Sequence, residues 1–166
     1  MNFAGSTSTA GPFVLGGNVT GNYGNQSAYV VKLSPTGGVL WAEQFGLTTN
    51  GSNGVSNATS ITVDGAGNVY LTGESGGTTS FFGTNLTSSD VFVVKLDTNG
   101  VFQWVTSAGG NGPDAGTGIA VDSFGDICVT GFINRSSASN YTADFDPTHS
   151  LTTSTQTAFL WQLTQP

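Results

Sequence analysis

The sequence predicts an all-β domain built from repeated four-stranded units. Helix signals are nearly absent, because apolar residues nowhere recur at helical spacing over several turns. Short runs of β-branched and aromatic residues lie instead between clusters of Gly, Asn, Asp and Ser, the pattern of strands joined by turns. An internal repeat, described next, defines the unit from which we expect the fold to be built.

The repeat is clearest in a short run that occurs three times. Ala28–Leu33 has the sequence AYVVKL, Val91–Leu96 has VFVVKL and Ala158–Leu163 has AFLWQL, so the copies follow one another at nearly equal intervals. Trp41 recurs as Trp104, at the same interval that separates the first two copies of the run. Such regular spacing indicates that one supersecondary unit is repeated along the chain.

The central copy shows the whole unit in order. Ser60–Asp64 and Asn68–Gly73 are the first two strands, joined by a Gly-Ala-Gly turn. A long connection leads to the third strand, Asp90–Leu96, and a turn leads to the fourth, Val101–Ser107. A repeated four-stranded unit of this length is typical of a β-propeller blade, whose strands are buried on both faces. We expect a single domain of residues 1–166 with about three antiparallel blades, at approximately 1–47, 55–108 and 115–166.

The central unit also carries the motifs of a known repeat family. They are Asp90-Val-Phe-Val-Val-Lys-Leu-Asp-Thr-Asn-Gly, Trp104, Gly109-Gly110, Gly118-Ile-Ala-Val-Asp-Ser-Phe-Gly-Asp and Val129-Thr-Gly131. This set resembles the SBBP-type β-propeller repeat, and Ala143–Pro147 resembles an insert often found between the second and third strands of such repeats. The resemblance covers nearly the whole chain from about Pro12. It implies a bacterial protein that is secreted or attached to the cell surface, and it brings no shared catalytic residues.

Composition and charge exclude several classes of protein. The chain has 166 residues, a net charge of −7 and three cations, Lys32, Lys95 and Arg135, which are too few for the phosphate contacts of nucleic-acid binding. No apolar run approaches the roughly 18 residues of a membrane span, and no signal-peptide pattern follows Met1. Cys128 is the one cysteine, so an internal disulfide is excluded. We expect neither a nucleic-acid partner nor membrane insertion.

The connections at the two ends of a blade differ in length. The first–second and third–fourth connections are tight turns, whereas the others are long, and in an up-and-down blade they lie at opposite ends. Asp64 and Asp122 occupy equivalent tight turns, and we expect them to cap those turns rather than bind a metal. Any ligand is expected to contact the long loops 74–90 and 132–156, because long loops on a rigid scaffold carry most binding sites.

The strongest polar group in these loops is formed by Asp144, Asp146 and His149. Asp144 and Asp146 could hold a divalent cation, and Ca²⁺ would need further oxygens such as backbone carbonyls. The alternative is that both aspartates make turn hydrogen bonds beside Pro147. His149 is expected to be an exposed loop residue.

Candidate catalytic residues are scarce. Gly73–Gly77 fits the pattern G-x-S-x-G, but no helix follows it and the one histidine is distant. Glu43 and Glu74 are the only glutamates, and they belong to different blades. We therefore expect no enzyme but a non-catalytic extracellular or cell-surface module for adhesion or for carbohydrate or protein binding. The alternative is a structural subunit of a surface fibre or filament, assembled head to tail; a propeller hydrolase or lyase is a third interpretation.

Propeller closure is the last expectation from the sequence. Closed propellers use four to eight blades, whereas about three are recognised here. Residues 1–11 lack the first-strand motif, and Pro166 follows directly after a third strand. An open arc would expose a sheet edge and an apolar blade face. We expect the partners to be further blades of the same polypeptide or other copies of the chain, in which residues 1–7 could pair beside a neighbour's third strand.

Overall fold

Antiparallel strands make up the fold in the computed structural model, which describes residues 3–7, 13–20, 26–48, 55–87, 90–110, 112–134, 141–146 and 148–165. Within these residues every regular element is a strand, which confirms the predicted all-β class. The described part contains no helix long and apolar enough to cross a membrane.

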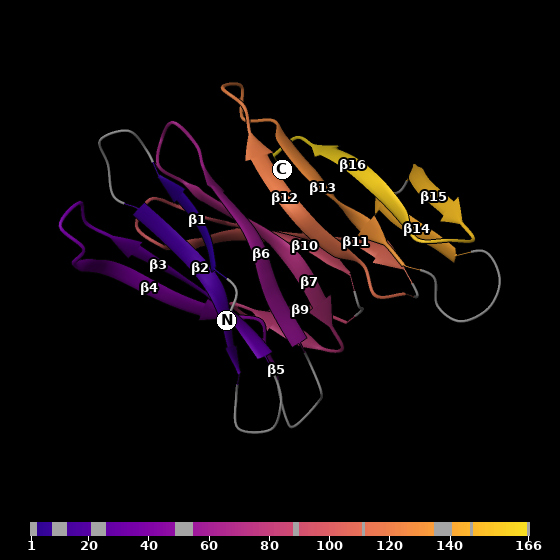
Figure 1. Ribbon diagram of the computed structural model, residues 1–166, viewed down its shortest axis with the longest axis horizontal. Helices are drawn as coiled ribbons and strands as arrows, with labels where there is room; N and C mark the ends of the chain where they lie inside the picture. Colours follow the sequence, from indigo (N-terminus) through magenta and orange to yellow (C-terminus); the bar gives the residue numbers. More distant parts are fainter. Residues whose placement is uncertain are drawn as a thin grey trace.

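Three groups of strands, which we call blades 1, 2 and 3, follow one another in a row (Figure 1). Blade 1 contains β1 (Phe3–Thr7), β2 (Phe13–Thr20), β3 (Gln26–Leu33) and β4 (Val39–Phe45). Blade 2 contains β6 (Val55–Val63), β7 (Val69–Gly76), β10 (Val91–Leu96) and β11 (Phe102–Gly110). Blade 3 contains β12 (Ala115–Val121), β13 (Ile127–Ile133) and β16 (Thr157–Leu163). Neighbouring strands within each blade pair antiparallel in chain order, as in propeller blades.

The first strand of blade 1 corrects an expectation from the sequence. Residues 1–11 carry no first-strand motif, yet β1 pairs antiparallel with β2, from Phe3 opposite Gly17 to Thr7 opposite Phe13. Strand pairing uses backbone N–H and C=O groups, which nearly every residue supplies, so a strand can form without the motif. Because residues 3–7 pair with β2 of their own chain, they do not occupy the edge of a third strand here.

Burial differs between the central blade and the third one. Nearly every residue of β7 and β10 is buried, because blade 2 is covered on both faces. Residues of β13 and β16 alternate instead between buried and exposed or half-buried, which is the pattern of a sheet covered on one face. Two hydrophobic cores result. The first lies between blades 1 and 2 and includes Val30, Phe45, Leu71, Phe92 and Val94; the second lies between blades 2 and 3 and includes Tyr70, Val91, Val93, Val129 and Trp161.

The two predicted long loops fold as β-hairpins rather than as loops. Strands β8 (Thr79–Phe81) and β9 (Thr84–Leu86) form one hairpin, and β14 (Tyr141–Asp146) and β15 (His149–Thr153) form the other. Each pairs with the segment at the end of the fourth strand of the preceding blade: β8 with β5 (Leu47–Thr48), and β14 with β11. The hairpins therefore link adjacent blades.

The starting point of these two links repeats along the chain. Leu47 lies opposite Ser80 in the first link, and Gly110, the repeat equivalent of Leu47, lies opposite Ala143 in the second. Each link includes a glycine with positive φ: Gly46 at +71°, whose N–H donates to the Ser80 carbonyl, and Gly109 at +151°, which lies opposite Asp144. A Cβ at Gly109 would lie within 2.7 Å of carboxylate oxygens of two aspartates, so this close approach requires glycine.

Candidate functional site

The tight-turn end of the blades is built from repeated aspartate-capped turns. Asp64 Oδ1 accepts hydrogen bonds from the backbone N–H groups of Ala66 and Asn68, both at 2.9 Å. Asp122 Oδ1 accepts the equivalent bonds from Phe124 and Asp126, at 2.8 and 2.9 Å. The turn-capping role expected for both aspartates is confirmed. These aspartates therefore stabilise the tight turns.

The hairpin end carries the side chains that differ from blade to blade. Figure 1 shows β5, β8–β9 and β14–β15 at the end of the blades away from the β6–β7 and β12–β13 turns. In the hairpin of blade 2, Phe81 is fully buried, and its ring lies 5.6 Å from that of Phe45 and 4.9 Å from that of Phe92. This hairpin is thus held by aromatic packing.

The hairpin of blade 3 is held by a buried aspartate that the sequence analysis missed. Asp114 is fully buried, and its carboxylate accepts hydrogen bonds from the Tyr141 hydroxyl, from the Asn134 N–H (2.9 Å) and from the Gly110 N–H (3.2 Å). The bond from Tyr141 joins the start of β14 to the connection between β11 and β12. Two of the three donors, Asn134 and Tyr141, are 20 and 27 residues from Asp114, so no local motif announced the cluster.

Burial sets the charge state of this anchor. It raises the pKa of Asp114 above its ordinary value of 3.8; hydrogen bonds from Tyr141, Asn134 and Gly110 lower it by less, and the nearby charge of Asp90 raises it further. Burial and the bond to Asp114 also raise the pKa of Tyr141. The anchor therefore keeps Tyr141 as a hydrogen-bond donor, and it fixes the hairpin that carries Asp144, Asp146 and His149.

The structure brings Asp146 and His149 together in the turn between β14 and β15. Asp146 Oδ1 accepts hydrogen bonds from Thr148 N and Oγ1, both at 2.7 Å, and from His149 N at 2.9 Å. Its Oδ2 lies 2.7 Å from His149 Nδ1. The bonds from Thr148, followed by the one from His149, lower the pKa of Asp146 to about 2. His149 is 77% exposed in its side chain, as the sequence predicts.

This geometry favours the turn interpretation of Asp146 over Ca²⁺ binding. Both oxygens of Asp146 accept hydrogen bonds from Thr148 and His149, as the turn interpretation expects. Asp144 is exposed, and its backbone pairs with Gly109. Among the residues that the structure describes, no group of three or more His, Cys, Asp or Glu side chains could hold a metal ion. Asp144 and Asp146 line one pocket together with Thr148, His149 and Ser150, and Ca²⁺ needs six to eight oxygens, so Ca²⁺ binding by the two aspartates stays a prediction.

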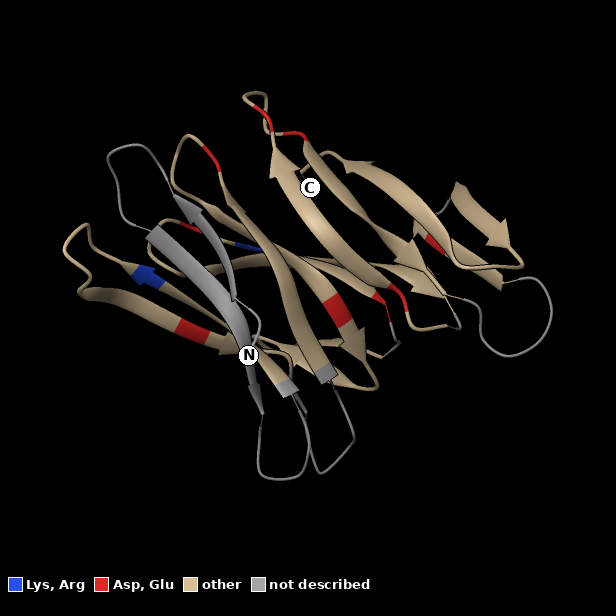
Figure 2. Cartoon of the chain, in the orientation of Figure 1, with Lys and Arg blue, Asp and Glu red and all other residues tan. Residues whose placement is uncertain are grey.

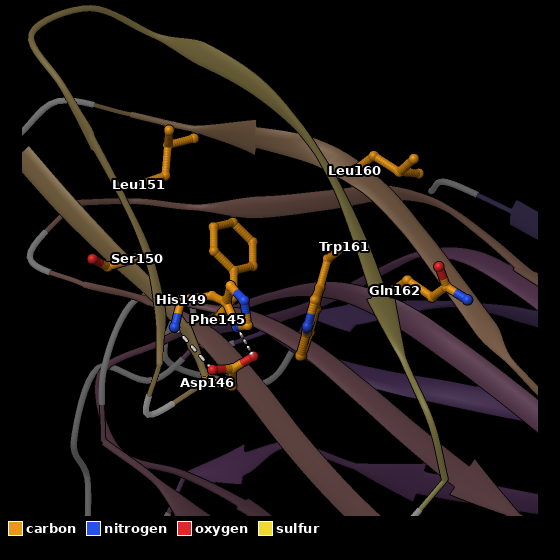
Figure 3. Close-up of a pocket in the computed structure, with 8 residues that line it drawn as sticks. All are labelled: Phe145, Asp146, His149, Ser150, Leu151, Leu160, Trp161 and Gln162. Atoms are coloured by element: carbon orange, nitrogen blue, oxygen red, sulfur yellow. Dashed lines mark hydrogen bonds and ion pairs between the residues drawn. The ribbon is translucent and has the colours of Figure 1, made fainter.

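A pocket of about 300 Å³ opens between this hairpin and β16. Figure 3 shows the rings of Phe145 and Trp161 beside each other, with the Asp146 carboxylate below them. The ring centroids are 5.9 Å apart, and the ring planes are inclined at 61°. The lining residues are Phe145, Asp146, His149, Ser150, Leu151, Leu160, Trp161 and Gln162. The pocket thus combines apolar walls with an ionised acceptor and hydroxyl and amide groups.

The pocket carries a negative charge from Asp146 that no cation in its described lining balances. Among the described residues that line it, Asp146 is the one carboxylate, and neither Lys nor Arg is present. Figure 2 shows no blue segment on β14 or β15. An anion would meet a fixed negative charge here with no compensating cation, so anionic ligands are disfavoured.

The G-x-S-x-G match does not form a nucleophile site. Ser75 lies within β7, is 2% exposed, and its N–H donates to the Asp90 carbonyl at 2.8 Å. A nucleophile elbow instead needs a strand–turn–helix with the hydroxyl exposed. Glu74, beside it, accepts a hydrogen bond from Asn57 Nδ2.

The fold defines a class: a repeat protein of antiparallel propeller blades, here with a pocket beside an inserted hairpin. Comparison with known proteins agrees. The family model described as the SBBP β-propeller repeat matches residues 40–82, which confirms the predicted resemblance over that stretch. The chain is also similar to an uncharacterized WD repeat-containing protein of Acanthamoeba polyphaga mimivirus. The two are 29% identical over 132 residues, which cover 73% of this chain and 9% of the viral protein.

Proposed function

We propose that the chain is a non-catalytic extracellular or cell-surface binding module, and that the pocket between the β14–β15 hairpin and β16 is its ligand site. The observation that carries the proposal is the pocket itself, where two aromatic rings adjoin an ionised carboxylate fixed by hydrogen bonds. Concave sites with apolar walls and a few oriented polar groups are the usual form of small-ligand sites. The match to a propeller repeat and the similarity to a WD-repeat protein support a repeat-based binding module.

The proposed ligand is an uncharged glycan or a neutral segment of a surface protein. Phe145 and Trp161 offer apolar ring surface for the carbon face of a sugar or for a side chain. Asp146, Ser150 and Gln162 offer acceptors and donors for hydroxyl or amide groups. The abundance of hydroxyl and amide side chains and the scarcity of charged ones are in keeping with a hydrated exterior surface. Further blades, in this polypeptide or in other copies, are proposed as additional partners.

The chemistry of Asp146 supports the proposed non-catalytic role. A general acid in glycoside cleavage needs a pKa raised towards neutrality, whereas the pKa of Asp146 is lowered to about 2. The side chain is therefore a permanent acceptor, suited to binding rather than to proton transfer. The lining of the pocket offers no second carboxylate to act as nucleophile or base.

A glycan array and a pull-down from cell-surface proteins, each probed with the intact chain, test this proposal. Phe145→Ala and Asp146→Asn should each weaken binding by about tenfold, the effect of losing one central contact. Phe124→Ala is the matched control, because Phe124 is 91% exposed in a tight turn at the opposite end. Circular dichroism should show an unchanged β-fold in all three variants. Binding that survives both pocket substitutions would show that the ligand site lies elsewhere.

A further inference from the structure

The outer face of blade 3 has the composition of a blade junction but is exposed. Cross-strand pairing places Cys128 opposite Gln162 and Thr130 opposite Leu160, and Phe132 pairs with Ala158. We call Cys128, Thr130, Ala158, Leu160 and Gln162 the outer face of blade 3. Leu160 is 71% exposed. Val30 and Val93 occupy the same position in the first two copies of the repeat, and both are fully buried against the next blade.

A polar contact repeats at the two junctions within the chain. Lys32 Nζ of blade 1 donates to the Thr98 carbonyl at 2.7 Å, in the turn after the third strand of blade 2. Lys95 Nζ of blade 2 donates to Gln165, which follows the third strand of blade 3. The third-strand cation of one blade thus reaches the chain just beyond the third strand of the next. Gln162 occupies the same repeat position in blade 3, and it retains a side-chain N–H donor.

Blade 1 presents the complementary half of such a junction. On its outer face, Tyr29 pairs with Gln44 and Val31 pairs with Ala42. Tyr29 and Val31 are half-buried there. Their repeat equivalents in blade 2, Phe92 and Val94, are fully buried against blade 1. The two ends of the row therefore carry third-strand faces equivalent to those that meet at the internal junctions, whereas the described residues of blade 3 include no fourth-strand counterpart of Trp41 or Trp104.

The turn at the end of blade 1 has the shape of a junction turn as well. At the internal junction, Trp41 of blade 1 packs against Gly100 in the blade 2 turn, where a Cβ would lie 2.9 Å from the indole ring. Gly37 is the repeat equivalent of Gly100 and has the same backbone angle, with φ +86° against +85°. A Cβ at Gly37 would meet nothing within 4 Å. The blade 1 turn therefore has open space on the side where a neighbouring blade would lie.

We propose that the outer face of blade 3 binds the outer face of blade 1 of a second copy, head to tail. Leu160 would be buried as Val93 is, and the Gln162 amide would donate to the Pro35 carbonyl, the repeat equivalent of the Thr98 carbonyl. Such a contact is heterologous, so it either closes into a ring or grows into a filament. Two copies would supply about six blades, within the range of closed propellers. The contact shares Leu160 and Gln162 with the lining of the ligand pocket, so a bound ligand would compete with the second copy; in the absence of ligand the contact does not depend on what the pocket binds.

Sedimentation velocity of the intact chain over a wide concentration range, without ligand, tests the proposal. We expect reversible association that Thr130→Arg weakens by at least about tenfold, because it places an unpaired charge in the contact. Thr130 does not line the pocket. Gln162→Lys restores the cation of the internal junctions and should strengthen association several-fold, since charge-assisted hydrogen bonds are the stronger ones. Phe124→Arg in the tight turn is the control and should change nothing.

A mixing experiment identifies the two faces. Ala42→Arg disables the blade 1 face and Thr130→Arg the blade 3 face, so each variant alone should stay monomeric. Mixed together, they retain one intact contact and should form a one-to-one dimer. The thiol of Cys128 should react more slowly with an alkylating reagent in the associated state. A chain that stays monomeric at all concentrations would overturn the proposal. Association that Thr130→Arg does not weaken, in a variant whose circular dichroism is unchanged, would overturn it as well. In either case the outer face of blade 3 would be left for another blade of the same polypeptide.

Discussion

The two inserted hairpins share one topology but are held by different chemistry. The hairpin of blade 2 is anchored by Phe81, buried between Phe45 and Phe92. The hairpin of blade 3 is anchored by the hydrogen bond from Tyr141 to the buried Asp114. Because the two links start at equivalent positions of the repeat, the repeat specifies where a hairpin attaches, while the side chains at the anchor are free to differ.

This difference separates a structural hairpin from a binding one. The aromatic anchor has no ionisable group, so its strength should be independent of pH. The polar anchor places a carboxylate of raised pKa beneath the hairpin that lines the pocket. We therefore expect the two hairpins to respond differently to substitution and to pH, and the following predictions measure that difference.

Phe81→Ala should have the largest effect. Removing this fully buried ring leaves a cavity between Phe45 and Phe92 and should lower the free energy of unfolding by about 3–5 kcal/mol. Urea denaturation followed by circular dichroism measures this change. The control Phe124→Ala removes a ring that is 91% exposed and should change the free energy by no more than about 0.5 kcal/mol. Equal effects of the two substitutions would contradict aromatic anchoring.

Tyr141→Phe should lower the free energy of unfolding by less than Phe81→Ala does. It should loosen the β14–β15 hairpin locally. It removes one donor to Asp114 and leaves the carboxylate less satisfied, which costs about 1–3 kcal/mol. Limited proteolysis should then cut the β14–β15 region faster and leave β8–β9 unchanged. Tyr70→Phe is the matched control, because it removes a hydroxyl bonded to Asp64 at the tight-turn end. Faster cutting at β14–β15 in that control as well would show that general destabilisation is responsible.

The pH dependence of stability should differ in sign between the buried and the exposed aspartate. The pKa of Asp114 is raised in the folded chain, so its contribution is fully present below 3.8 and is lost as pH rises through the folded value. The pKa of Asp146 is lowered to about 2, so its contribution is present above 3.8 and is lost as pH falls through about 2.

Denaturation at a series of pH values checks both signs. In a plot of the free energy of unfolding against pH, Asp114→Asn should remove the fall in stability with rising pH. Asp146→Asn should remove the loss of stability at acid pH. Asp114→Asn also disturbs the hydrogen bonds of the anchor and so changes stability at every pH. The measurement is therefore the change in how steeply the free energy of unfolding varies with pH. Parallel pH profiles for wild type and Asp114→Asn would contradict a raised pKa.

Chelation should have the smallest effect. Because the Asp146 oxygens accept hydrogen bonds from Thr148 and His149, we expect the same melting temperature with and without a calcium chelator. Asp144→Ala should not alter that equality. A melting temperature lowered by chelator, with the difference abolished by Asp144→Ala, would establish the Ca²⁺ site instead.

The sequence predicted the parts of the fold that repeat. The run AYVVKL and its copies located β3, β10 and β16, because side chains buried between blades are restricted to apolar types. It did not predict β1, whose pairing depends on backbone groups. The hairpins were expected as loops, since short strands rich in Thr, Ser and Asn differ little in composition from turns.

The candidate site could be predicted in its local half only. Asp146 and His149 are close neighbours in the sequence, so their contact follows from turn chemistry. Trp161 reaches the same pocket from β16, and Asp114 reaches Tyr141 from the other side of blade 3. Both contacts depend on how the hairpin crosses between blades, which no spacing in the sequence encodes.

The stretch matched by the repeat family is out of phase with the blades, and this has an evolutionary consequence. Residues 40–82 begin in the fourth strand of blade 1 and end in the hairpin of blade 2. One such segment therefore contains both partners of a hairpin link, including Phe45 and Phe81. The matched stretch itself lacks the third strand, β10, so a tandem duplication that adds a blade must span the full repeat; started in this phase, it would carry the two partners of a hairpin link together.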